Sequence, residues 1–236
     1  MLQAASAIAL STQELPKIIL AIGALGTAAY GVVDVSKGFG GGISNRGFGD
    51  IKKVVSRFLP ATSGDNASSA LSLLSVLATL RSNWLNGMAL ADQKSIAKAL
   101  IKLNLNTDTV SRMAAAAGVD EAVLGSIAGK LSTGAALTPA ETDVYGRFDL
   151  SLTAVLDQGY QRGDQRYRNS AKLLAVPVAV LLALLGAWAI SPGALSSADF
   201  WRAVAGGFLA TPLAPVAKDL ASAVQAGSKL AQAWNK

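Results

Sequence analysis

The chain has 236 residues, 51% of them hydrophobic, a mean hydropathy of +0.39 and a formal net charge of +6. Only 15% of its residues are charged, whereas soluble domains carry about 25%. It contains no cysteine and no histidine, which excludes disulfides, thiolate metal sites, catalytic triads and histidine-based zinc sites. We therefore expect a non-enzymatic membrane protein without a metal or cofactor.

Residues 1–36 are predicted to hold an N-terminal segment and a first transmembrane helix. Residues 18–33 carry no charged side chain and follow Pro16, which suits the first turn of a helix. Asp34 marks the end of this span, where it either lies at headgroup depth or pairs with Lys37 one turn later. The alternative is a carboxylate that lines a pathway through the membrane. Small residues recur every four positions and predict a face for helix packing or oligomerisation: Gly23, Thr27 and Gly31.

Residues 37–66 are predicted to form a Gly-rich basic linker. They contain two Gly-Phe-Gly sequences, at 38–40 and 47–49, followed by basic side chains. Glycine indicates a flexible hinge at the membrane exit, and the alternative is a cradle for lipid phosphates or another anion. The basic residues assigned here to the lipid headgroups are Lys52, Lys53 and Arg57.

Residues 67–160 are predicted to form a cytosolic helical domain. The apolar run 67–80 is too short and too rich in serine for a further span and suits a buried helix. Helices are expected over 92–103, 108–117 (capped by Thr107) and 120–131, and no segment alternates as a strand would. The sequence Thr138-Pro139-Ala140-Glu141 predicts a capping box that starts a further helix.

Residues 161–190 are predicted to form a basic stem and the second transmembrane helix. Residues 173–190 are uncharged and span roughly 27 Å as a helix, close to the hydrocarbon thickness of about 30 Å. Gly159 and Gly163 predict a bend or a short break before the span. Arginines interleaved with tyrosines also occur in nucleic-acid binding sites. Beside a membrane span, however, this pattern favours contact with anionic lipid headgroups. The residues that we assign to this contact are Arg162, Arg166, Arg168, Lys172 and Tyr167.

Residues 191–236 are predicted to form a turn, a third transmembrane helix over 203–217 and a helical tail. Trp201 marks the membrane interface. Pro212 and Pro215 predict a kink or an unwound turn. Small residues again repeat every four positions, at Gly206, Ala210 and Ala214, and predict a second face for helix packing or oligomerisation. The residues assigned to a pathway through the membrane are Asp34, Pro212, Pro215, Lys218 and Asp219.

Charge distribution predicts the orientation. Residues 37–172 contain 16 of the 21 lysines and arginines, and the short segment 191–201 contains none. Because basic residues near span ends stay on the cytoplasmic side, residues 37–172 and the C-terminus are expected in the cytoplasm and the N-terminus outside.

The sequences GYQRGDQRYRNSAKLL and FLATPLAPVAKDLASAVQAG make this chain resemble uncharacterised bacterial inner-membrane proteins with three spans and a cytosolic helical insert. The resemblance implies an all-α integral membrane protein of the bacterial cytoplasmic membrane, and it implies no activity and no site residue.

Taken together, the patterns favour a membrane scaffold subunit that forms homo-oligomers through its spans. Its basic helical domain would face anionic lipids and a cytosolic protein partner, and no nucleic-acid partner is expected. The alternative is an oligomeric channel or transporter whose pathway lies at the proline-interrupted third span.

Overall fold

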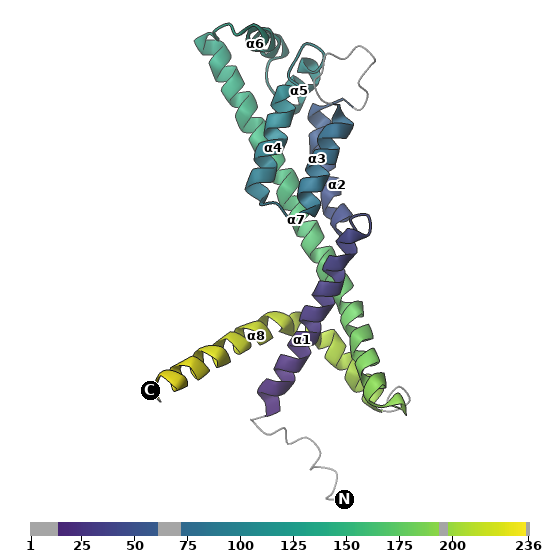
Figure 1. Cartoon of the computed structure of the whole chain (residues 1–236). Coiled ribbons are helices and arrows are strands. Elements are labelled where there is room, and N and C mark those ends of the chain that lie inside the picture. Colours follow the sequence, from purple (N-terminus) through teal and green to yellow (C-terminus); the bar gives the residue numbers. More distant parts are fainter. Residues whose placement is uncertain (1–13, 61–71, 194–197, 235–236) are drawn as a thin grey trace, which may run out of the picture. The chain divides into compact units, whose positions relative to one another are not determined.

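The computed structural model describes residues 14–60, 72–193 and 198–234, and every regular element in these ranges is helical (Figure 1). The all-α prediction is therefore confirmed for this part of the chain. The chain divides into two compact units: the apolar unit, residues 1–40 and 169–236, and the helical domain, residues 41–168. The predicted N-terminal segment up to residue 13 lies outside the described residues.

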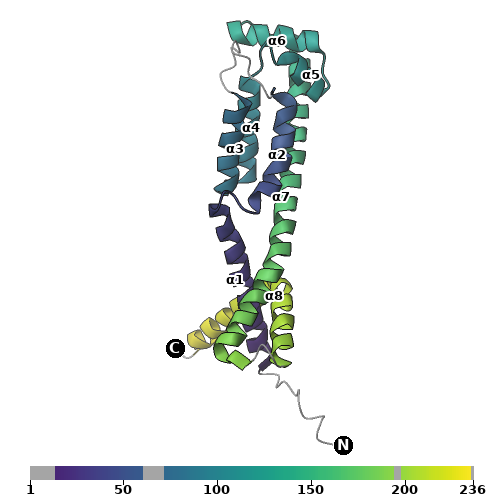
Figure 2. The same ribbon diagram turned by 90° about the vertical axis from the view of Figure 1, so that its right-hand side faces the viewer.

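The helical domain is built from five helices and the first part of a sixth, much longer one. These are α2 (Ser44–Phe58), α3 (Leu73–Leu85), α4 (Leu90–Leu103), α5 (Val110–Ala117), α6 (Glu121–Thr133) and α7 (Pro139–Ile190). Figures 1 and 2 both show α2, α3 and α4 running beside α7, with α5 and α6 at one end of the domain. The helices enclose one core, whose largest fully buried side chains include Phe58, Phe148, Leu80, Ile101, Met113 and Tyr160.

Local signals set several helix ends in this domain. Ser72 and Asp120 cap α3 and α6 by accepting hydrogen bonds from backbone N–H groups three residues later. Gly118 ends α5 in the left-handed conformation. The expected cap at Thr107 is wrong, because the Asn106 side chain accepts hydrogen bonds from the N–H groups of Asp108 and Thr109. That turn delays the helix to Val110.

The prediction of a flexible linker over 37–66 is wrong for residues 44–58, which form α2. Phe48, Ile51, Val55 and Phe58 recur at helical spacing and are buried in the domain core. The glycines of this segment misled the prediction, because they also occur where two helix backbones approach closely. The rest of the predicted linker includes residues 61–71, which lie outside the described part of the chain.

The glycines at 47, 159 and 163 bring α2 and α7 into backbone contact. A Cβ atom added to Gly163 would lie 2.7 Å from the Gly47 carbonyl oxygen, and one added to Gly47 would lie 2.5 Å from the Gly163 carbonyl oxygen. A Cβ atom on Gly159 would lie 2.7 Å from the side chain of Val54. The predicted break at these glycines is wrong, because α7 is continuous from Pro139 to Ile190. The predicted alternative, a bend within one long helix, stays a prediction. Glycine serves close packing here.

We predict that Gly163→Ala destabilises the helical domain by about 1–2 kcal/mol, because the new methyl group meets a backbone atom that cannot rotate away. Gly146→Ala is the matched control: it lies in the same helix with nothing within 4 Å of an added Cβ atom. That change should stabilise the helix by about 0.5–1 kcal/mol. Hydrogen exchange of the full chain in mild detergent measures both opening free energies, and equal effects would contradict the packing role of Gly163.

The capping box at the start of α7 is present as predicted. The Thr138 hydroxyl accepts a hydrogen bond from the Glu141 N–H at 3.3 Å, and the Glu141 carboxylate accepts one from the Thr138 N–H at 2.7 Å. The carboxylate also accepts hydrogen bonds from Lys130 at 2.6 Å and Ser126 at 2.8 Å, which ties α6 to α7. The Lys130 ammonium, together with the Thr138 N–H and the Ser126 hydroxyl, lowers the pKa of Glu141 to about 2.

This depressed pKa predicts an acid-sensitive contact. Because the folded state binds the Glu141 proton more weakly than the unfolded chain, the carboxylate stabilises the domain fully above pH about 4.5, and this stabilisation is lost as the pH falls toward about 2. Glu141→Gln should lower the thermal midpoint at pH 7, and the gap to the natural chain should close between these pH values. Asp143→Asn, at an exposed position of the same helix, is the control. A gap that stays constant down to pH 2 would contradict this role.

The apolar unit contains α1 (Glu14–Val35), a 3-10 turn (Ser36–Gly38), the last part of α7 and α8 (Ala198–Trp234). Two helices are long and apolar enough to cross a membrane, α1 with the following turn and α7. The third predicted span lies within α8 and stays a prediction. Both prolines, Pro212 and Pro215, lie inside α8 without ending it, and Figures 1 and 2 show that this helix changes direction partway along its length. This agrees with the predicted kink and excludes the predicted alternative of an unwound turn.

Candidate functional site

Small residues hold α1 against α8 in the apolar unit. A Cβ atom added to Gly26 would lie 2.1 Å from the Ala210 carbonyl oxygen, and one added to Gly23 would lie 2.0 Å from the Ala217 Cβ. Ala210 and Ala214 are buried in this contact. Such close approach is the usual reason for small residues at helix contacts within membranes.

The contact shares Gly23 with the predicted stripe on α1 but otherwise uses a neighbouring face of the helix. Its buried positions are Gly23, Gly26, Ala29 and Val33, which follow the helix period of 3.6 residues, whereas the predicted stripe repeats every four. Of the predicted residues, Thr27 is exposed and donates a hydrogen bond to the Gly23 carbonyl at 3.0 Å. Gly31 and Gly206 have no atom within 4 Å of an added Cβ. Counting spacings of three as well as four would have found Gly26.

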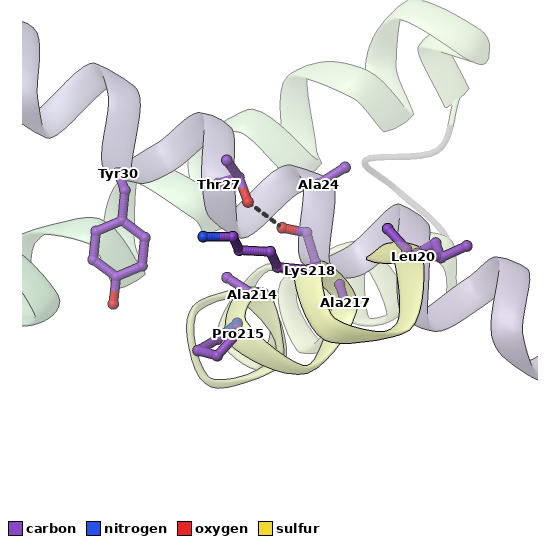
Figure 3. A pocket seen from close by; sticks show the side chains of 10 residues that line it. Leu20, Ala24, Thr27, Tyr30, Ala214, Pro215, Ala217 and Lys218 are labelled. Carbon is purple, nitrogen blue, oxygen red and sulfur yellow. Dashed lines mark hydrogen bonds between the residues drawn. The ribbon is translucent and has the colours of Figure 1, made fainter. Parts of the chain in front are cut away.

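A groove of about 640 Å³ lies beside this contact (Figure 3). Its lining is mostly apolar and includes Leu20, Tyr30 and Pro215, with Thr27 and Lys218 as polar members. Of the residues assigned to a pathway, the structure thus brings Pro215 and Lys218 to the groove. Pro212 and Asp219 are exposed and do not line it, and Asp34 forms the ion pair with Lys37 that the spacing predicted.

A second site, the basic cleft, lies in the helical domain between α2 and α7. Its volume is about 280 Å³, and we define it by its polar lining residues: Asp50, Lys53, Arg57, Gln158, Arg162 and Arg166. Lys53 and Arg57 are one turn apart on α2, and Arg162 and Arg166 are one turn apart on α7. Residues four apart lie on the same helix face, so each helix presents two cations to the cleft.

Charges in the basic cleft are not balanced. The Arg166 Nε lies 3.1 Å from the Asp50 Oδ2 atom, which is itself buried and accepts no hydrogen bond. No ion pair joins Lys53, Arg57 or Arg162 to a carboxylate within the residues that the structure describes. The opposite face of α7 differs, because Lys98 and Lys102 both pair with Asp149, at 2.6 and 3.0 Å.

The remaining residues assigned to lipid headgroups are not among those that line the cleft. Lys52, Arg168 and Lys172 are exposed, and Arg168 pairs with Asp164 at 2.7 Å. Tyr167 packs on the core of the helical domain, edge-on to Trp84 with ring centroids 6.2 Å apart. Trp201 is 70% exposed and contacts the Phe200 ring. Asp50 and Gln158 were missed from the sequence, where nothing distinguished them from other polar helix residues.

We predict that two glycine substitutions in α1 separate internal packing from self-association. Gly26→Leu should displace α8, because its side chain meets the backbone of Ala210. Gly31→Leu should leave the fold intact, because that position is open, and should weaken an oligomer that uses the open face. Protease sensitivity of α8 and sedimentation in mild detergent measure the two effects. An unchanged sedimentation profile for Gly31→Leu would remove this face from the oligomer.

Comparisons with protein-family models, with curated proteins and with solved structures gave no match.

Proposed function

We propose that this protein is a non-enzymatic scaffold of the bacterial cytoplasmic membrane. Three helical segments cross the bilayer in this proposal: α1, the apolar part of α7 and residues 203–217 of α8. The helical domain lies on the cytoplasmic side, where it binds a protein partner and anionic lipids, and the chain forms homo-oligomers through its spans. The observation that carries the proposal is the exposed apolar surface of α7.

That surface is not the core of a soluble protein. Only 11% of the apolar window of α7 and 22% of that of α1 is buried. The exposed side chains in this part of α7 include Leu173, Leu181, Leu185 and Trp188. Leaving a large apolar side chain in water forgoes about 1.5–3 kcal/mol relative to burying it. Lipid removes this cost, which supports a bilayer around this part of the helix.

The same helix behaves differently in the helical domain. There Phe148, Leu152 and Leu156 lie at helical spacing and are fully buried against neighbouring helices. One helix thus has a protein-covered apolar stripe in its first part and exposed apolar side chains in its last part. This contrast supports a change of surroundings along α7, from water and protein to lipid.

The third span is supported by the packing of α8 on α1. A helix that contacts a membrane-crossing helix through Gly26 and Ala210 shares its depth in the bilayer. Its outward side chains are also apolar, with Phe208, Leu209 and Val216 exposed. The open small-residue positions Gly31 and Gly206 support self-association, since no described residue packs against either.

The alternative function, an oligomeric channel or transporter, has narrower support. It rests on Lys218, a cation in the mostly apolar groove beside the Pro215 turn of α8. A charge in such surroundings is costly and usually has a use. We rank this alternative second, because Asp34 is paired with Lys37 and neither residue lines the groove.

Cysteine labelling tests the number of spans directly, because the natural chain has no cysteine. We expect Ser191→Cys to react with a membrane-impermeant maleimide added outside intact bacterial cells, whereas Ser132→Cys and Ser222→Cys react only after lysis. All three serines are exposed. Labelling of Ser222→Cys from outside would show that α8 does not cross, and labelling of Ser132→Cys from outside would overturn the cytoplasmic placement of the helical domain.

A further inference from the structure

We propose that the basic cleft between α2 and α7 is a binding site for a phosphate-bearing anion. The site lies wholly within the helical domain and does not depend on the number of membrane spans. Its ligand is a compact group with at least two negative charges, carried either by a soluble molecule or by a lipid headgroup. The proposal rests on how the helices place four cations together and on what balances their charge.

Helix packing fixes the position of these cations. Gly47 and Gly163 allow the backbones of α2 and α7 to touch, and Gly159 receives Val54 one turn earlier on α7. On α2, Lys53 and Arg57 lie on the C-terminal side of Gly47. On α7, Arg162 and Arg166 lie on either side of Gly163. The four side chains therefore converge on one cleft because two rigid helices cross closely, and the cleft exists before any ligand binds.

Electrostatics then favours an anion. Asp50 offsets only one of the four positive charges, through its contact with Arg166. Like charges gathered in a cleft repel each other, and a bound anion with two or more charges relieves that repulsion. Arginine suits phosphate in particular, because its planar guanidinium donates two parallel hydrogen bonds to two oxygens. Gln158 adds an amide that can donate to a further oxygen.

The size of the cleft limits the ligand. Its volume of about 280 Å³ is just below the range for small-molecule sites, which begins near 300 Å³. The lining is polar apart from Val54 and Gly159. A group of one to three linked phosphates fits these properties better than a large aromatic ligand, which would need apolar walls.

The test uses tripolyphosphate as the probe and the full chain held in lipid nanodiscs. In nanodiscs of phosphatidylcholine alone, calorimetry should show saturable binding that weakens as salt is raised. The double variant Arg57→Gln with Arg162→Gln should bind tripolyphosphate at least about tenfold more weakly. The reason is that losing one hydrogen bond to a charged group raises the dissociation constant by about that factor. The matched control is Arg46→Gln with Arg147→Gln, which removes the same charge from exposed positions of α2 and α7 outside the cleft.

A second arm separates the two sources of phosphate. If the natural ligand is a headgroup, nanodiscs containing phosphatidic acid should lose tripolyphosphate binding, and native mass spectrometry should show retained phosphatidic acid that the cleft variant loses. If the ligand is soluble, tripolyphosphate should bind equally in both kinds of nanodisc. Either result supports the site. Absence of binding in both arms, or equal loss in the cleft and control variants, would overturn it, whereas a failed three-span topology would leave it standing.

Discussion

The contact between the backbones of α2 and α7 is the constraint on which the helical domain depends. With glycine at both 47 and 163, the two helices meet without intervening side chains. Trp84 closes this region from α3, where its indole N–H donates to the Ser44 carbonyl at 3.0 Å and its ring packs edge-on to Tyr167. Any side chain larger than hydrogen at the crossing would separate the helices and move the cations of the basic cleft apart.

Within the helical domain, two faces of α7 have opposite electrostatic character. Asp149 and Asp157 are about two turns apart and lie on one face, where the lysines of α4 neutralise them. Arg162 and Arg166 lie on roughly the opposite face, beside α2, where Asp50 is the one carboxylate that lines the cleft. The paired face joins helices within the domain. On the face beside α2, Arg166 pairs with Asp50, whereas no ion pair within the described residues neutralises Arg162. This excess of positive charge favours a bound anion, as the proposed site requires.

The sequence allowed prediction of those features whose causes are local. The capping box at Thr138 and Glu141, the end of α5 at Gly118 and the ion pair of Asp34 with Lys37 each depend on residues within one turn. The apolar stretches of α1 and α7 were also evident, because composition alone makes a helix long and apolar enough to cross a membrane. The basic residues of α2 and α7 were found singly, but their meeting in one cleft depends on a contact between residues more than a hundred positions apart.

Glycine shows why the rest could not be predicted. The same residue type favours flexible linkers, helix breaks and close packing, and only the partner helix decides among these roles. Gly47 and Gly163 were assigned to a linker and a bend, yet both lie inside continuous helices, each with the other's carbonyl oxygen where its Cβ would stand. Tyr167 was assigned to the membrane interface for a related reason: its neighbours in sequence are arginines, while its neighbour in space is Trp84. A residue's chemistry is thus local, but the contact that gives it a role is set by packing between distant segments.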